Sequence, residues 1–334
     1  MTEGRPIAGL GEFRKISDQV RNWGRWGADD ELGTLNFITD AKVREGASLV
    51  RRGKVFPLGL NFGSYGPQPD PFGFRRNPIH LMTLDGGDSH FVDDVAGWGQ
   101  DPGAELVVSL WESDLARFND DYIIMPLQCA TQWDALSHIY YEEKLYNGYP
   151  ASSVTSFGAT KLAIDKADAR GITTRGVLVD VVRYREEHPV DPRTPITPDE
   201  LDAVLATQDT EVRSGDVVIV RTGSWQAFRH RAGPHEHPTG LSWRCAPWLH
   251  RHEIAAVAAD NIAVEALGRH VDGAGLPLHL LCLRDMGMMF GEMWFLDDLA
   301  EDCAGDAVYE FQIVAPPLRV TGGVGSPLNP IALK

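Results

Sequence analysis

The sequence predicts a protein of mixed α and β structure, α+β or mixed α/β, built as one compact domain with an N-terminal elaboration. Short β-branched apolar runs recur at 176–182, 216–221 and 311–315, and turn residues bound each of them. Helical segments are predicted between these strands, at 159–170 and 198–207. The two kinds of element do not alternate strictly, so a regular βαβ repeat is not indicated.

The N-terminal region has features of a separate structural element. Residues 1–55 are expected to form an extension that packs on the core, and 56–334 to form the main domain. A helix is predicted from 40 to about 52, because Thr39 or Asp40 can cap its first free amides.

The middle of the chain begins with a long segment rich in Gly, Pro, Asp and Asn at 64–103, which predicts an irregular loop. Loops of this length are usually functional, often as a lid. Further on, Thr197 and Pro198 favour a helix start, with acidic residues at its positive end. The apolar run 254–259 fits either a strand or a helix end.

Composition excludes several classes of protein. The 334 residues are 43% hydrophobic and 23% charged, as in ordinary globular proteins. A net charge of −16 argues against nucleic acid as a partner, since phosphate binding needs a basic face. We find no signal peptide and no apolar run of membrane-spanning length. The 4 cysteines form no CxxC pair, so a cytoplasmic location is expected.

The segment QCATQWDALSH, residues 128–138, concentrates polar side chains around one tryptophan. Gln128, Gln132 and Asp134 alternate, so on an extended strand they would share one face. His138 comes within reach of Asp134 if the chain turns into a helix there. The alternative is a polar strand whose Asp134 only caps a following helix.

A second polar pair lies in PLHLLCLRDMGMMFGEMWFLDDLA, residues 277–300. Glu292 stands among large apolar residues, where an unpaired buried carboxylate would be costly. It therefore faces solvent at an edge or has a partner in a site. His279 by itself fits a hydrogen-bonded core histidine, and the site interpretation depends on its meeting Glu292.

With these residues in view, a family resemblance is evident. QCATQWDALSH resembles the HxGTHxDxxxH signature of the cyclase family, the superfamily of kynurenine formamidase and isatin hydrolase. RWGADDELGTLNFIT, RGVLVDV, SGDVVIVRTG, the 260–265 stretch and TGGVGSPLNPIAL also resemble family blocks, so the match covers roughly residues 20–334. The resemblance implies a swivelling β/β/α architecture of the α+β class, and a homodimer or homotetramer.

Carried over by position, the signature's aspartate is Asp134 and its last histidine is His138, which inherits a general acid/base role. The two metal-binding histidines of the signature are replaced by Gln128 and Gln132, as in a long-chain subgroup. The family's later metal-binding His and Glu fall on His279 and Glu292.

These replacements bear on the cofactor. An amide oxygen is a harder and weaker donor than imidazole, so a two-metal centre is not expected. Asp134, His279 and Glu292 would hold one divalent ion (Mn, Zn or Mg), with Gln128 or Gln132 completing the shell. The oxygen-rich set favours Mn²⁺ or Mg²⁺. Alternatively, the glutamines bind substrate in a site that has lost its metal.

The resemblance implies a hydrolase acting on a small cyclic or aryl amide, ester or lactone, with His138, Asp134 and Glu292 as catalytic residues. Aromatic side chains could flank the substrate: Trp133, which fits the core equally well, and Phe72 and Phe74 of the long loop. Two alternatives are a metal-independent cyclase or dehydratase, in which Gln128 and Gln132 polarise a carbonyl, and a non-catalytic binding protein on a decayed scaffold.

Overall fold

The main sheet of the computed structural model has 9 strands in the order β1-β13-β11-β7-β8-β9-β10-β4-β12. Strands β7 to β10 run parallel to one another, and the strands on either side join antiparallel. The structure describes residues 7–68, 75–84, 118–167, 171–187, 190–191, 193–224 and 239–334. The strands of this sheet are β1 (Val55–Pro57), β4 (Gln132–Asp134), β7 (Thr173–Asp180), β8 (Val217–Arg221), β9 (Ala256–Ala259), β10 (Met289–Glu292), β11 (Glu310–Val314), β12 (Gly325–Pro327) and β13 (Ile331–Leu333).

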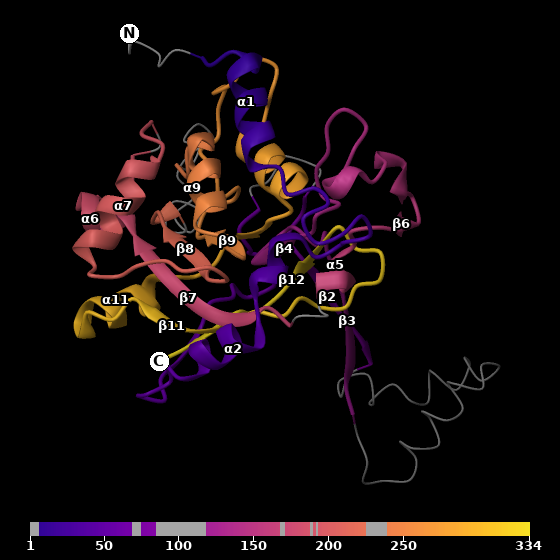
Figure 1. Ribbon diagram of the computed structural model, residues 1–334. Coiled ribbons are helices and arrows are strands. Elements are labelled where there is room, and N and C mark those ends of the chain that lie inside the picture. The colour runs from indigo at the N-terminus through magenta and orange to yellow at the C-terminus, as the bar shows by residue number, and fades with distance from the viewer. Residues whose placement is uncertain are drawn as a thin grey trace, which may run out of the picture.

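Helices cover both faces of the sheet, and the mixed α and β class predicted from the sequence is confirmed (Figure 1). Within the described ranges, none of them has the length and apolar character that a membrane span requires. The α-helices are α1 (Leu10–Val20), α2 (Asp40–Ala47), α5 (Ile164–Ala167), α6 (Val181–Arg185), α7 (Pro198–Thr207), α9 (Ala246–Arg251), α10 (Pro277–His279) and α11 (Asp297–Asp306). Short 3₁₀ turns lie at Gly33–Phe37, Tyr146–Gly148, Ala151–Ser153 and Trp243–Cys245, and a π-helical segment follows α10 at Leu280–Met286.

The central strands β8, β9 and β10 bury both of their faces, one in each of two cores. In β8, Val218 and Val220 pack with α1, α7, α9 and the π-helical segment. Val217 and Ile219 point the other way, into the core that contains residues of α5 and α11. Because successive side chains of a strand alternate in direction, a continuous apolar run is what a sheet covered on both faces requires.

Several predicted boundaries are confirmed and others shift. The helix 198–207 is α7, and the Thr197 hydroxyl accepts a hydrogen bond from the amide of Glu200. The helix from residue 40 is α2, capped by Thr39, but it ends at Ala47. The run 254–259 is a strand, β9, since its residues pair with β8 and β10.

Two predicted elements differ more. The helix expected over 159–170 is α5, which covers only Ile164–Ala167, because β6 (Gly158–Ala159) pairs with β5 (Val154–Thr155) in a small hairpin. The segment 64–103 is not irregular throughout. It contains β2 (Ile79–Leu84), which pairs antiparallel with β3 (Asp120–Ile124).

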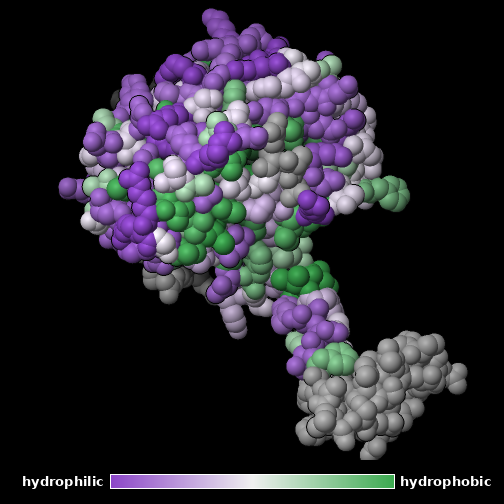
Figure 2. Space-filling view, turned by 60° about the horizontal axis from the view of Figure 1, so that its bottom comes forward, coloured by the Kyte–Doolittle hydropathy of each residue, from purple (hydrophilic) through white to green (hydrophobic). Residues whose placement is uncertain are grey.

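The β2–β3 ribbon projects from the body of the molecule (Figure 1 and Figure 2). Paired residues of antiparallel strands share a face, so Ile79, Leu81, Tyr122 and Ile124 lie together on one face of it. Each of these four side chains is at least 43% exposed. The ribbon therefore presents an apolar face that no described residue covers.

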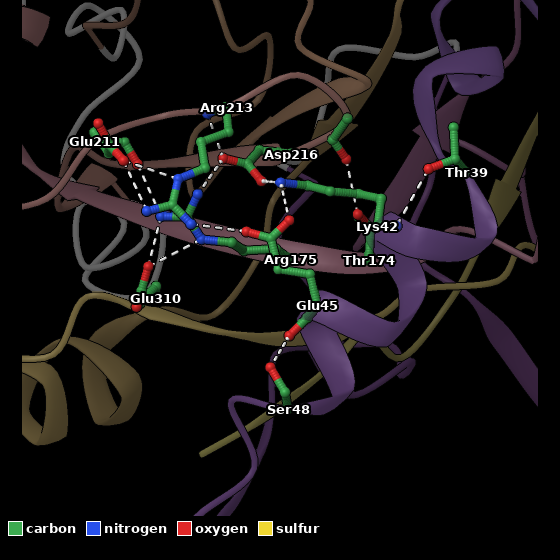
Figure 3. Close-up of polar contacts among 11 residues, drawn as sticks. Thr39, Lys42, Glu45, Ser48, Thr174, Arg175, Glu211, Arg213, Asp216 and Glu310 are labelled. Atoms are coloured by element: carbon green, nitrogen blue, oxygen red, sulfur yellow. Dashed lines mark hydrogen bonds and ion pairs between the residues drawn. The ribbon is translucent and has the colours of Figure 1, made fainter.

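Charged side chains join the N-terminal segment to the sheet (Figure 3). The carboxylate of Asp216, the residue before β8, lies 2.6 Å from the Lys42 ammonium of α2 and 3.0 Å from the Arg175 guanidinium of β7. All three side chains are buried. On the same α2 helix, Gly46 lies so close to the backbone of Thr174 that a Cβ atom there would be 2.7 Å from it. Helix α2 is thus held directly on β7.

A second charged cluster ties the C-terminus to α11. Asp302 of α11 forms ion pairs with Arg52, Lys54 and Lys334, and only 10% of its side chain is exposed. The cluster thus links Lys54, which precedes β1, and Lys334, which follows β13, to helix α11. Burial alone would raise the pKa of Asp302, but the hydrogen bonds from these cations lower it to about 2.

Candidate active site

The site begins with the pairing of β4 and β10. In this register Gln132 lies opposite Glu292, and Asp134 lies opposite Phe290. Since opposed residues share a face, all four side chains point to the same side of the sheet. The Gln132 amide donates a hydrogen bond of 2.5 Å to Glu292 Oε2. Two residues of the predicted site are therefore paired directly by the sheet.

His279 reaches this face from α10. Its Nε2 lies 3.4 Å from Glu292 Oε1 and 4.0 Å from Asp134 Oδ2. The imidazole packs edge-on against Phe290, with ring centroids 4.8 Å apart. One ligand atom from each of Asp134, His279 and Glu292 lies within 4.8 Å of the others, and all three side chains are buried. Three segments distant in sequence thus meet at one point.

His138 completes the group. It does not begin a helix: a turn, closed by the His138 amide to the Ala135 carbonyl, brings it back toward Asp134. Its Nε2 lies 3.7 Å from Asp134 Oδ1. With 22% of its side chain exposed, it is the most open of the four residues. Of these residues, it is therefore the one best placed to meet a molecule arriving from solvent.

Burial and neighbouring charges set the protonation of the group. Burial, and then repulsion by Glu292, raise the pKa of Asp134 well above its usual value. Burial also lowers the pKa of His138 to about 4, so its ring is neutral at neutral pH. Burial alone would lower the pKa of His279, but hydrogen bonds to Glu265 and Glu292 raise it to about 10. The two imidazoles therefore differ in proton affinity although they face the same carboxyl group, as groups with separate acid/base roles must.

Several buried polar atoms in the site have no hydrogen-bond partner among the described residues. They are both Asp134 oxygens, Gln132 Oε1 and Gln128 Nε2. Buried polar groups are almost always hydrogen-bonded or bound to an ion. Two orphaned carboxylate oxygens beside a second carboxylate and an imidazole fit one divalent cation. Asp134 makes no cap to a helix, so that alternative is wrong.

Other predicted site residues have different surroundings. The strand covers only Gln132–Asp134, so Gln128 lies in the turn before it. Its amide still reaches the Asp134 face, because a Cβ on Gly325, which pairs with Asp134, would lie 2.5 Å from Gln128 Nε2. Trp133 points into the opposite core, where its indole donates to the Ala315 carbonyl and packs edge-on against Trp294. Its assignment as a substrate contact is therefore corrected to the core role. Phe72 and Phe74 lie outside the described residues.

Two residues of the site were not identified from the sequence. The Glu265 carboxylate accepts a hydrogen bond from His279 Nδ1. After burial, Glu292 and His279, the positive charge of Arg75 also acts on the pKa of two site residues: it opposes the rise at Asp134 and adds to the fall at His138. Neither residue belongs to a motif or lies at a sequence spacing that would identify it as functional. The only available signal for Glu265 was its place in the 260–265 stretch that resembles the family.

Comparison with known proteins assigns the chain to a family. The model of the family described as Putative cyclase matches residues 71–266, more than half of the chain. A crystal structure described as a novel cyclase is 40% identical, with a TM-score of 0.81, and the match covers 95% of this chain and 99% of that one.

More distant structures share the fold. Isatin hydrolase A from Labrenzia aggregata, bound to benzyl benzoate, is 16% identical with a TM-score of 0.58, covering 84% of this chain and 93% of that one. A predicted metal-dependent hydrolase from Bacillus stearothermophilus is also 16% identical, with a TM-score of 0.52 and coverage of 84% and 98%. No curated protein matches. The chain belongs to the Putative cyclase family.

Proposed function

We propose that this protein is a cyclase-family hydrolase that acts on a small cyclic or aryl amide, ester or lactone, with one divalent cation held by Asp134, His279 and Glu292. The observation that carries the proposal is the meeting of these buried side chains around two Asp134 oxygens that lack hydrogen-bond donors among the described residues. Fold neighbours described as isatin hydrolase and as metal-dependent hydrolase support it.

A cation in this position would supply Lewis-acid polarisation of the substrate carbonyl, and it would take the place of the proton that His279 Nε2 otherwise carries. The donor set has one imidazole nitrogen and carboxylate oxygens, and therefore favours Mn²⁺ or Mg²⁺ over Zn²⁺. Gln132 holds the Glu292 carboxylate in place through its amide. The neutral ring of His138, the most open of the group, accepts a proton from the attacking water and returns it to the leaving group.

The test combines metal content with turnover of a panel of aryl formamides, cyclic amides and lactones. Asp134→Asn should purify with less Mn²⁺ than the wild type, because it loses an anionic ligand. His138→Ala should keep the metal and lower kcat by about 10²–10⁴-fold, the usual contribution of a general acid/base. Full turnover by chelated, metal-free protein would refute the metal-dependent mechanism.

A metal-independent cyclase or dehydratase is the second candidate, and one observation favours it. Gln128 Nε2 is a buried donor without a partner among the described residues, so it is available to a substrate carbonyl. Gln132 is less suitable, since its amide already donates to Glu292. In this case chelated protein should keep its turnover, and Gln128→Leu should lose it.

A further inference from the structure

The Glu265 carboxylate holds His279 at both its backbone and its ring. Glu265 Oε1 accepts from the His279 amide at 2.9 Å and from His279 Nδ1, while Oε2 accepts from the Leu278 amide at 3.1 Å. Glu265 is 1% exposed. With Nδ1 engaged in this way, the opposite ring nitrogen, Nε2, is the one that faces Glu292 and Asp134.

Glu265 is the last residue of the turn 261–265. The first residue of this turn, Asn261, is hydrogen-bonded to the chain directly after β10, the strand that carries Glu292. The Asn261 side-chain oxygen accepts from the Val264 amide at 2.7 Å, and its amide donates to the Thr239 carbonyl at 2.7 Å. The Asn261 carbonyl accepts from the amide of Met293, the residue after Glu292, at 2.8 Å. The turn 261–265 therefore connects the segments that present Glu292 and His279.

This turn is strained where it meets Glu265. Val264 has φ of 56°, a conformation that a β-branched residue rarely adopts. Such strain costs about 1–3 kcal/mol and persists only where the surroundings impose it. Here they do: the Val264 carbonyl accepts from the Leu241 amide at 2.9 Å, and a Cβ on Gly240 would lie 2.3 Å from the Val264 oxygen. Strain at such a position points to a functional requirement.

We infer that Glu265 is a positioning residue, which orients the His279 ring so that Nε2 is presented to the cation, and that the turn 261–265 sets the separation of His279 and Glu292. The inference rests on the proposed function in one respect: that function supplies the divalent cation to which Nε2 is presented. The contact between Glu265 and the ring does not depend on it. A metal-binding histidine commonly donates its second ring nitrogen to a carboxylate, and loss of that partner costs about 10–100-fold in metal affinity.

The test titrates purified, chelator-treated full-length protein with Mn²⁺ and compares two variants. Glu265→Gln keeps an oxygen acceptor for the ring, whereas Glu265→Leu keeps none. We expect affinity to fall modestly in the first and about 10–100-fold in the second. Asp260→Asn is the matched control, because Asp260 is a nearby buried carboxylate that binds Thr222 and Gly223 instead. Its Mn²⁺ affinity should match the wild type.

A second measurement needs no variant. In selectively ¹⁵N-labelled wild-type protein, the ring N–H proton of His279 should be shifted downfield and protected from exchange. An ordinary, rapidly exchanging resonance would overturn the inference, as would unchanged Mn²⁺ affinity in Glu265→Leu. If the wild type binds no metal, the proposed function fails, and the NMR signal alone then decides the role of Glu265.

Discussion

Gly291 provides a sharp test of how tightly the site is built, because it precedes Glu292 in β10. A Cβ placed on it would lie 2.7 Å from Ala258 Cβ and 2.9 Å from each of two atoms, one in the Trp133 ring and one in the Trp294 indole. All three neighbours are buried and cannot rotate away. Gly291→Ala therefore forces β10 away from β9 or from the tryptophans, and it displaces the adjacent Glu292.

The magnitude follows from two opposing effects. Overpacking of a filled core costs about 1–3 kcal/mol, and three rigid contacts put this site in the upper half of that range. Replacing Gly by Ala also lowers the conformational entropy of the unfolded chain, which stabilises the folded protein by about 0.5–1 kcal/mol. We expect a net loss of about 1–2.5 kcal/mol in the free energy of unfolding, together with weaker Mn²⁺ binding.

Urea unfolding followed by tryptophan fluorescence measures the first effect, and Mn²⁺ titration the second. The matched control is Gly11→Ala in α1, where no atom lies within 4 Å of the added Cβ. This change should stabilise the protein by about 0.5–1 kcal/mol, as for Gly to Ala in an exposed helix. If Gly291→Ala proved as stable as the control and bound Mn²⁺ normally, our account of the packing behind Glu292 would be wrong.

Three further predictions concern the rest of the molecule. Because the pKa of Asp302 is about 2 when folded and higher when unfolded, its contribution to stability is present above about pH 4 and lost as the pH falls toward 2. Asp302→Asn should flatten the dependence of the unfolding free energy on pH in that interval; an unchanged slope would contradict the assignment. We propose that the expected homodimer or homotetramer forms through the apolar face of the β2–β3 ribbon, which is exposed in the single chain. Leu81→Lys should then shift the mass measured by light scattering toward that of the monomer, and an oligomer that persists in this variant would contradict the proposal. Trp133→Phe should destabilise the protein by about 1–3 kcal/mol through loss of its hydrogen bond and packing, but leave KM unchanged; a raised KM would restore Trp133 as a substrate contact.

The predictions from sequence succeeded where local rules suffice. Thr197 and Pro198 mark the start of α7 because capping and a fixed proline φ act within one turn of chain. The strand predicted at 216–221 is β8, Val217–Arg221, because a β-branched apolar run between turn residues is a local signal. The helix at 159–170 was overestimated, since pairing of Gly158–Ala159 with β5 is a contact that local propensity does not encode.

For the site, the sequence by itself determined the chemical groups. Asp134, His138, His279 and Glu292 were identified from residue type and from the resemblance to the family, and so was the replacement of two histidines by Gln128 and Gln132. Alternation along a strand also predicted correctly that Gln132 and Asp134 share a face, because the period of two is a local property of extended backbone.

Only the tertiary structure decided how these groups meet. The register of β4 against β10 set Gln132 opposite Glu292, and the same pairing turned Trp133 into the far core. The partner of His279 Nδ1 was equally undetermined, because Glu265 lies on a separate turn. The register depends on hydrogen bonds between strands about 160 residues apart, and the position of the turn depends on contacts with other segments. No spacing within a single segment records either of them.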